Sequence, residues 1–233
     1  MHGDVTQGLL WFAVFLFSTV CHEASHAWAA LKLGDDTAAR GGQVSLNPWP
    51  HVRREPFGMV VVPLISWFAA GWMIGWASAP YDPVWARQWP RRAALMALAG
   101  PAANLTLLLA AAWLIRIGVE WQVFTAPWSL GSSHMVDAVN AGPWDTAARV
   151  LSIMFSLNLL LCVFNLLPLP PLDGSSVPLL LLPAGLAEKY SHALQAPVLR
   201  YAGLLLASRL LGPFFPTLLL AAGRLLYPSA HYA

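Results

Sequence analysis

The sequence has 233 residues, of which 58% are hydrophobic and only 10% are charged. An ordinary soluble domain carries about 25% charged residues, so this composition excludes a soluble fold and predicts a protein embedded in a lipid bilayer. The net charge of +2 and the lack of any Lys- or Arg-rich run exclude a nucleic-acid partner. Cys21 and Cys162 lie in apolar runs without CxxC spacing, which argues against a disulfide framework or a thiolate metal site.

Five apolar stretches are close to or longer than the roughly 20 residues that a transmembrane helix needs. They cover residues 8–31, 57–79, 93–117, 148–170 and 197–226. No polar linker divides them, so we expect residues 1–233 to form a single all-α polytopic membrane domain. The stretches 57–79 and 197–226 contain internal prolines and glycines, so either could be re-entrant or broken instead of a straight span.

The distribution of basic residues predicts how these stretches cross the membrane. Lys and Arg occur on both sides of 57–79, in 32–54 and 87–92, whereas the loop 118–146 has none. Basic residues favour the cytoplasmic side, so 57–79 is expected to enter the membrane and return, and 118–146 to lie outside. The first and fourth stretches then both end at the cytoplasmic side of a cell membrane, at the same depth.

The first stretch contains the motif His22-Glu23-Ala24-Ser25-His26. Two histidines four residues apart project from one face of a helix, so both imidazoles can bind one zinc ion while the neighbouring glutamate acts on water. A chance HExxH pattern is the alternative. Three ionisable residues within five positions of an apolar span are costly, however, and this favours a metal site. We expect His22 and His26 to bind zinc and Glu23 to act as general base.

A catalytic zinc site needs a third protein ligand. The best candidate is Asp173, which follows the prolines that end the fourth stretch, in Asn165-Leu166-Leu167-Pro168-Leu169-Pro170-Pro171-Leu172-Asp173-Gly174. A turn-forming Asp-Gly pair at the membrane surface is the alternative interpretation. The charge pattern favours the ligand, because it places the ends of the first and fourth stretches at one depth, where one metal ion can contact all three side chains.

The motifs also occur in a distinctive order: HExxH, then Ser45-Leu46-Asn47-Pro48, then Leu98-Ala99-Gly100-Pro101-Ala102-Ala103-Asn104, then Asn165 to Gly174. In this combination the sequence resembles the site-2 protease family of intramembrane zinc metalloproteases, particularly its short bacterial members without a PDZ or CBS domain. The resemblance implies a site-2-protease-like transmembrane core with a re-entrant or β-hairpin segment between the first and third helices, in a bacterial inner membrane. It implies one zinc ion per chain, held by His22, His26 and Asp173, with Glu23 as general base.

Two asparagines in these motifs have two interpretations each. Asn104 lies inside the third stretch and Asn165 near the end of the fourth. An asparagine within a membrane bundle usually forms hydrogen bonds between or within helices, as structural glue. The family pattern instead makes both of them candidate catalytic residues, and Asn104 a candidate donor to the developing oxyanion.

The sequence therefore predicts hydrolysis of a peptide bond in or near a transmembrane segment of another membrane protein, as in regulated intramembrane proteolysis. The alternative is a non-proteolytic metal-binding scaffold or a transporter. Glu23 argues against a scaffold, since binding alone needs no base beside the metal. A transporter should have further ionisable residues along a path across the membrane, and no such path is evident. A separate regulatory or PDZ-containing protein is a further candidate partner.

Overall fold

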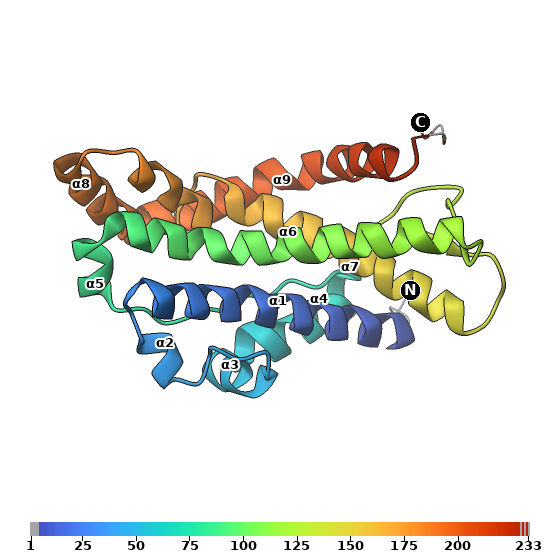
Figure 1. Ribbon diagram of the computed structural model, residues 1–233, viewed down its shortest axis with the longest axis horizontal. Helices are drawn as coiled ribbons and strands as arrows, with labels where there is room; N and C mark the ends of the chain where they lie inside the picture. Colours follow the sequence, from blue (N-terminus) through green and yellow to red (C-terminus); the bar gives the residue numbers. More distant parts are fainter. Residues whose placement is uncertain (1–4, 229, 231, 233) are drawn as a thin grey trace.

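Four long helices dominate the computed structural model, which describes residues 5–228, 230 and 232 (Figure 1). They are α1 (Val5–Leu33), α6 (Pro90–Glu120), α7 (Pro143–Leu166) and α9 (Pro197–Leu226), and all four are long and apolar enough to cross a membrane. The shortest, α7, has 24 residues, so it is about 36 Å long and exceeds a hydrocarbon core of about 30 Å. The prediction of an all-α polytopic membrane fold is confirmed.

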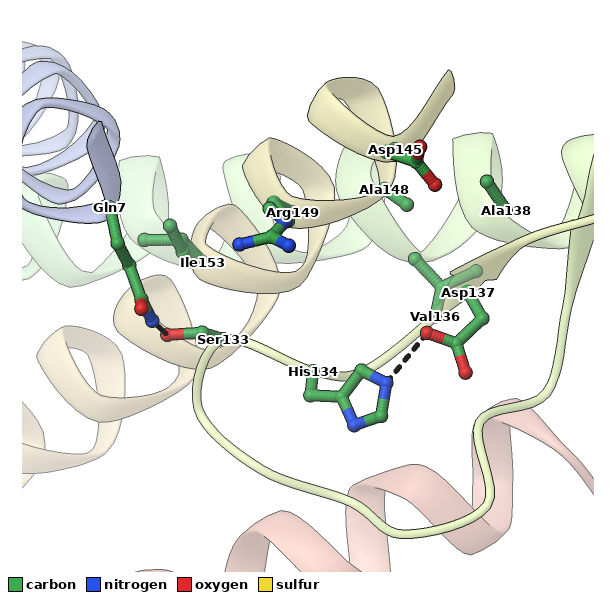
Figure 2. A pocket seen from close by; sticks show the side chains of 10 residues that line it. All are labelled: Gln7, Ser133, His134, Val136, Asp137, Ala138, Asp145, Ala148, Arg149 and Ile153. Atoms are coloured by element: carbon green, nitrogen blue, oxygen red, sulfur yellow. Dashed lines mark hydrogen bonds and ion pairs between the residues drawn. The ribbon is translucent and has the colours of Figure 1, made fainter. Parts of the chain in front are cut away.

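Shorter elements connect the long helices. They are α2 (Thr37–Arg40), α3 (Pro48–Arg54), the π-helix η1 (Phe57–Val61), α4 (Val62–Ala70), α5 (Pro83–Gln88), the 3-10 helix η2 (Asp173–Leu180) and α8 (Ala184–Leu194). The strands found in the described residues, β1 (Phe124–Thr125) and β2 (Asp137–Ala138), form one antiparallel pair in the loop between α6 and α7. A cavity of about 300 Å³ opens where this loop meets the starts of α1 and α7 (Figure 2).

Helix α6 packs against both α1 and α7, and also against η2. The segments that carry the predicted site residues therefore meet along one helix. The outward faces of the helices remain apolar and exposed, with Leu109, Trp113 and Phe214 59%, 64% and 65% exposed. Exposed apolar surface of this extent suits contact with lipid better than contact with water.

Residues 57–82 form a fold-back segment between α3 and α5. Its first arm, η1 and α4, ends at Gly71, whose φ of 67° is a conformation that favours glycine. The return arm runs beside the first arm: the Trp76 backbone N–H donates to the Gly58 carbonyl at 3.1 Å, and the Ile74 N–H donates to the Ser66 hydroxyl at 2.9 Å. The chain therefore turns back within this stretch, and its entry into the membrane stays a prediction from the charge pattern.

The β-hairpin alternative for this segment is not found, because none of residues 57–82 forms a strand. The first arm is helical throughout, and Pro63 lies just after the point where η1 continues into α4. The two arms also approach closely at glycines, and a Cβ added at Gly75 would overlap the Gly58 carbonyl. The segment is thus a helix followed by irregular chain.

An apolar cluster holds the fold-back segment against the bundle. Trp67 and Met73 from the two arms pack with Trp11 of α1 and Ile153 of α7. Gly8 makes room for this contact, since a Cβ at that position would meet the Trp67 ring. Between helices in lipid, close packing of this kind stabilises the fold, because lipid chains are as apolar as the side chains themselves.

Helices α9 and α7 show how the last two predicted apolar stretches are built. Helix α9 continues unbroken through Pro213 and Pro216, so the last apolar stretch is one helix and not a hairpin. Helix α7 ends at Leu166, and Leu167 is extended before Pro168, the conformation that a following proline favours. The chain leaves α7 here and leads to Asp173 at the start of η2.

Candidate metal centre

Helix α1 places His22, Glu23 and His26 inside the bundle, where 7%, 6% and 7% of their surfaces are exposed. The i,i+4 spacing brings the two histidine Nε2 atoms to 3.0 Å from each other, with the rings edge to face at a centroid distance of 4.6 Å. The motif therefore produces the converging histidine pair that its spacing predicts.

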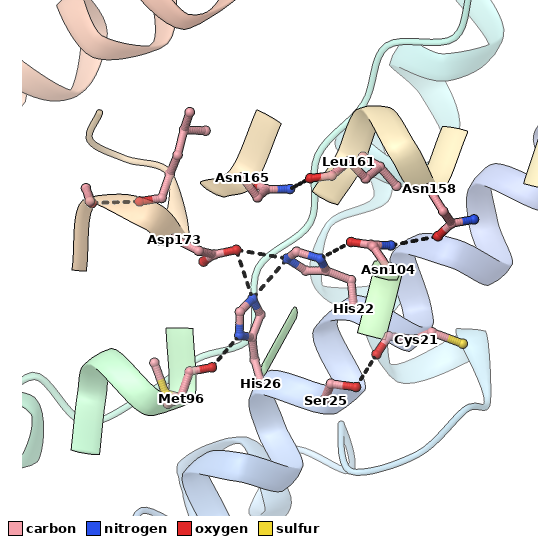
Figure 3. A network of polar contacts seen from close by, with 12 residues as sticks. Cys21, His22, Ser25, His26, Met96, Asn104, Asn158, Leu161, Asn165 and Asp173 are labelled. Carbon is pink, nitrogen blue, oxygen red and sulfur yellow. Dashed lines mark hydrogen bonds and ion pairs between the residues drawn. The ribbon is translucent and has the colours of Figure 1, made fainter. Parts of the chain in front are cut away.

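Asp173 reaches this pair from the start of η2 (Figure 3). Its Oδ2 atom lies 3.2 Å from His22 Nε2 and 3.4 Å from His26 Nε2. This buried oxygen has no hydrogen-bond partner of satisfactory geometry. A carboxylate oxygen without a hydrogen-bond partner thus faces both rings.

The other ring nitrogen of each histidine meets an acceptor. His26 Nδ1 lies 2.9 Å from the Met96 carbonyl oxygen, and His22 Nδ1 lies 2.6 Å from Asn104 Oδ1. Carbonyl oxygens accept but do not donate, so each Nδ1 carries a proton and each neutral ring presents the Nε2 lone pair. Partners of this kind are typical of metal-binding histidines.

Three acceptor atoms therefore converge, and a cation among them relieves their repulsion. Two histidines and one carboxylate are a donor set of catalytic zinc sites with an open position. Ligands 2.0–2.1 Å from a tetrahedral zinc ion would be about 3.3 Å apart, close to the observed 3.0, 3.2 and 3.4 Å. Gly100 of α6 faces both histidines, and a Cβ there would overlap their Nε2 atoms. The residues fit a zinc ion.

Comparison with known proteins agrees with this geometry. The sequence profile of peptidase family M50 matches residues 10–208. The chain belongs to peptidase family M50. This is the site-2 protease family, so the resemblance carried by the ordered motifs is confirmed.

Curated proteins also match this M50 chain. It is 36% identical over 180 residues to the Bacillus subtilis protein named "Putative zinc metalloprotease YwhC", a match covering 76% of this chain and 71% of YwhC. It is 32% identical over 182 residues to the Mycobacterium tuberculosis protein named "Putative zinc metalloprotease Rip2", a match covering 74% of this chain and 60% of Rip2. The match thus spans less than two thirds of Rip2. No solved structure matches the chain significantly.

The structure separates the two asparagines that the M50 motifs single out. Asn104 is fully buried and belongs to the centre: its Oδ1 faces His22, and its Nδ2 donates to Asn158 Oδ1 at 2.9 Å. Both ends of the side chain thus have partners inside the bundle, which favours a positioning role over an oxyanion donor. Asn165 donates to the Leu161 carbonyl at 3.0 Å, one turn earlier in its own helix. This contact favours the structural interpretation of Asn165.

Several residues around the centre were not singled out for it by the sequence. Asn158 of α7 is fully buried and donates to Ser18 Oγ at 2.9 Å. A polar residue in an apolar span was an available signal, but the partners of Asn158 depend on helix packing. Met96 contributes only its backbone carbonyl, which no side-chain pattern reveals. Gly100 was part of a recognised motif, yet its closeness to the histidines required the fold.

Two cavities lie at opposite ends of the bundle. One, of about 200 Å³, borders Asp173 and is lined in part by polar side chains, including Ser175, Ser176 and Gln195. The other is the cavity in Figure 2, where His134 Nε2 lies 2.6 Å from Asp137 Oδ1. Gln7 of α1 lines the second cavity, whereas His22 of the same helix belongs to the metal centre. The 15 residues that separate them along α1 correspond to a rise of roughly 22 Å. The second cavity is therefore separate from the centre.

Proposed function

We propose that this M50 chain is a zinc metalloendopeptidase that hydrolyses a peptide bond in or near a transmembrane segment of another protein. One observation carries the proposal: His22, His26 and Asp173 converge, with Glu23 beside them, inside a bundle whose helices are long enough to cross a membrane. Membership of a peptidase family and the names of YwhC and Rip2 support it.

The depth of the centre along α1 supports cleavage within the membrane. His22 lies 17 residues after Val5 (22 − 5) and 11 residues before Leu33 (33 − 22). At 1.5 Å per residue these separations are about 26 Å and 16 Å, so the centre lies well inside a helix that spans a core of about 30 Å. Lys and Arg flank the Leu33 end of α1 and not the loop 118–146. We infer that the centre opens towards the cytoplasm.

In this mechanism Glu23 is the general base. When bound by His22, His26 and Asp173, zinc supplies a Lewis acid for water and the scissile carbonyl. Glu23 is buried next to His22 in the chain, and its carboxylate is a group that can accept a proton. Glu23 takes one proton from the attacking water as the water oxygen adds to the carbonyl carbon. It delivers this proton to the amide nitrogen as the C–N bond breaks.

Cleavage at this centre needs an unwound substrate segment and a route for water. A helix shields its peptide bonds with side chains and internal hydrogen bonds, so the substrate segment must unwind locally before attack. The cavity beside Asp173, with Ser175, Ser176, Ser191 and Gln195 among its lining residues, offers water a polar route to the carboxylate. Water can thus reach the centre through this cavity.

The substitution Glu23→Gln tests the proposal. Gln has nearly the same size but cannot accept the proton, so the variant should retain zinc while cleavage of a model transmembrane substrate falls by about 100-fold or more. Zinc content and cleavage are measured on purified protein in lipid vesicles. Glu120→Gln, which changes an exposed acid at the end of α6, should cleave like the native chain.

Two outcomes would contradict the proposal. Cleavage that Glu23→Gln leaves unchanged would remove Glu23 from the mechanism. A native chain that binds zinc but does not cleave any transmembrane substrate would instead favour the non-proteolytic metal-binding scaffold.

A further inference from the structure

We infer that Asn158 is a positioning residue, which fixes the orientation of the Asn104 amide and thereby the protonated nitrogen of His22. The inference rests on the proposed zinc site. Asn158 lies on α7 and is fully buried, and none of its hydrogen bonds is to one of the three proposed ligands. Any effect of Asn158 on zinc binding must therefore be transmitted through another residue.

The orientation of the Asn158 amide is set by a backbone group. Its Nδ2 atom donates to the Met154 carbonyl at 2.8 Å and to Ser18 Oγ at 2.9 Å. The Met154 carbonyl accepts hydrogen bonds and cannot donate one, so the nitrogen end of the amide must face it. A flipped amide would place two buried oxygens against each other. Oδ1 of Asn158 is therefore held on the opposite side.

The orientation of the Asn158 amide determines that of the Asn104 amide. Asn158 Oδ1 can only accept, so the Asn104 group beside it, at 2.9 Å, must be the Nδ2 donor. The oxygen of Asn104 then faces His22 Nδ1 at 2.6 Å, and Nδ1 must carry the proton. The Nε2 lone pair of His22 is left for the side that faces Asp173. The Met154 carbonyl thus fixes the orientations of the Asn158 and Asn104 amides. These amides in turn fix which ring nitrogen of His22 can bind metal.

His26 has a simpler arrangement. Its Nδ1 lies 2.9 Å from the Met96 carbonyl, a backbone acceptor whose orientation needs no further support. Asn104, in contrast, is a side-chain amide that can present either end, so it needs a second residue to make it an acceptor for His22. Asn158 supplies this constraint.

Burial makes the network sensitive to each member. Ser18, Asn104 and Asn158 are all 0% exposed, so water cannot readily replace a partner that is removed. Ser18 lies one helical turn before His22 on α1, and the chain of hydrogen bonds runs from α1 through α6 and α7 back to α1. Loss of a partner behind a metal-binding histidine typically lowers metal affinity about 10–100-fold.

The first test compares Asn158→Leu with Ser156→Ala. Ser156 is equally buried on the same helix, but its hydroxyl donates to the Ser132 and Ile153 carbonyls and lies outside the network. Zinc affinity is measured by competition with a chromogenic chelator, and the melting temperature is measured without zinc. Asn158→Leu should weaken zinc binding about tenfold or more, whereas Ser156→Ala should leave it unchanged. Equal affinity in Asn158→Leu and the native chain would overturn the inference.

A double-mutant cycle tests whether Asn158 acts through Asn104. Asn104→Ala should weaken zinc binding by itself, and adding Asn158→Leu should then cause little further loss, because the amide that Asn158 orients is gone. Losses that multiply would show that the two residues act independently and would refute the inference. A native chain that binds no zinc would refute the proposed function itself.

Asn158→Asp separates positioning from packing. The aspartate keeps an oxygen acceptor for Asn104 Nδ2, so zinc should bind more tightly than in Asn158→Leu, although a buried carboxylate should lower the melting temperature. A packing role alone predicts that Leu is better in both measurements, and that order would overturn the inference. If Asn158→Leu does not fold, Ser18→Ala removes one acceptor of the Asn158 amide and should still weaken zinc binding. Native affinity in Ser18→Ala would then count against the network.

Discussion

Asp173 Oδ2 lies 3.2 Å from His22 Nε2. This contact joins the interior of α1 to the segment that follows α7. Helix α6 packs against α1, α7 and η2 and thereby holds the two segments in register. The proposed zinc ligands are therefore assembled by the whole bundle, and binding of zinc should stabilise the same packing that brings the ligands together.

Asp173→Ala should greatly reduce the zinc content of the purified protein. The substitution removes the carboxylate and leaves two histidines, so zinc affinity should fall by more than the roughly 10–100-fold expected for loss of an outer partner. Zinc per chain is measured by elemental analysis after desalting. Asp137→Ala, in the cavity at the other end of the bundle, is the control and should keep its zinc. Full zinc content in Asp173→Ala would remove it from the ligand set.

Gly100→Ala should block zinc binding without unfolding the protein. A Cβ at this position overlaps the Nε2 atoms of His22 and His26, while alanine is a better helix former than glycine by about 1 kcal/mol. Gly212→Ala in α9 is the matched control, because a Cβ there meets no atom within 4 Å. Zinc affinity and helix content by circular dichroism distinguish the two variants. Native zinc affinity in Gly100→Ala would show that the space beside the histidines is not needed.

Asp35 should make stability depend on pH. It is buried in the turn after α1, and its carboxylate accepts hydrogen bonds from the Thr37 backbone N–H and hydroxyl at 3.0 and 2.5 Å and from the Asp82 N–H at 2.8 Å. Burial would raise the pKa of Asp35, but these hydrogen bonds, with Arg40 nearby, lower it below its ordinary value. The contribution to stability is therefore complete above the ordinary pKa of about 3.9 and is lost as the pH falls through the lower, folded-state pKa.

Asp35→Asn measures this contribution. The difference in melting temperature from the native chain should be largest above about pH 5 and should shrink below about pH 4. Asp36→Asn is the control, since the exposed Asp36 pairs only at the surface with Arg40 and should contribute little at any pH. A constant difference between native and Asp35→Asn across pH 3–7 would contradict the assignment.

Features set by neighbouring residues in the sequence were predicted well. The spacing of His22 and His26 fixes their relation on any helix, and the long apolar runs appear as α1, α6, α7 and α9. The charge pattern added a non-local inference, because it placed the ends of two stretches at one depth and so brought Asp173 towards the histidines. The structure places these three side chains together, while binding of zinc by them remains a prediction.

The sequence was ambiguous where several backbone conformations suit the same residues. Prolines and glycines in 57–79 and 197–226 left re-entrant, broken and straight forms open. In the structure, residues 57–79 fold back, with a helix as the first arm. This form is packed through Trp67 against Trp11 and through the close approach of Gly58 and Gly75. In α9 the two prolines lie within a helix that continues past them.

The sequence by itself therefore determined the long apolar spans and the converging histidine pair, because these follow from composition and helical periodicity. It also predicted Glu23 as the base and Asp173 as the third ligand, and these two roles stay predictions. Only the tertiary structure decided that Asn104 faces His22, that Asn158 orients Asn104, and that Gly100 leaves space beside both histidines. Each of these depends on how one helix is rotated against another, and the sequence of a uniformly apolar helix does not specify that rotation.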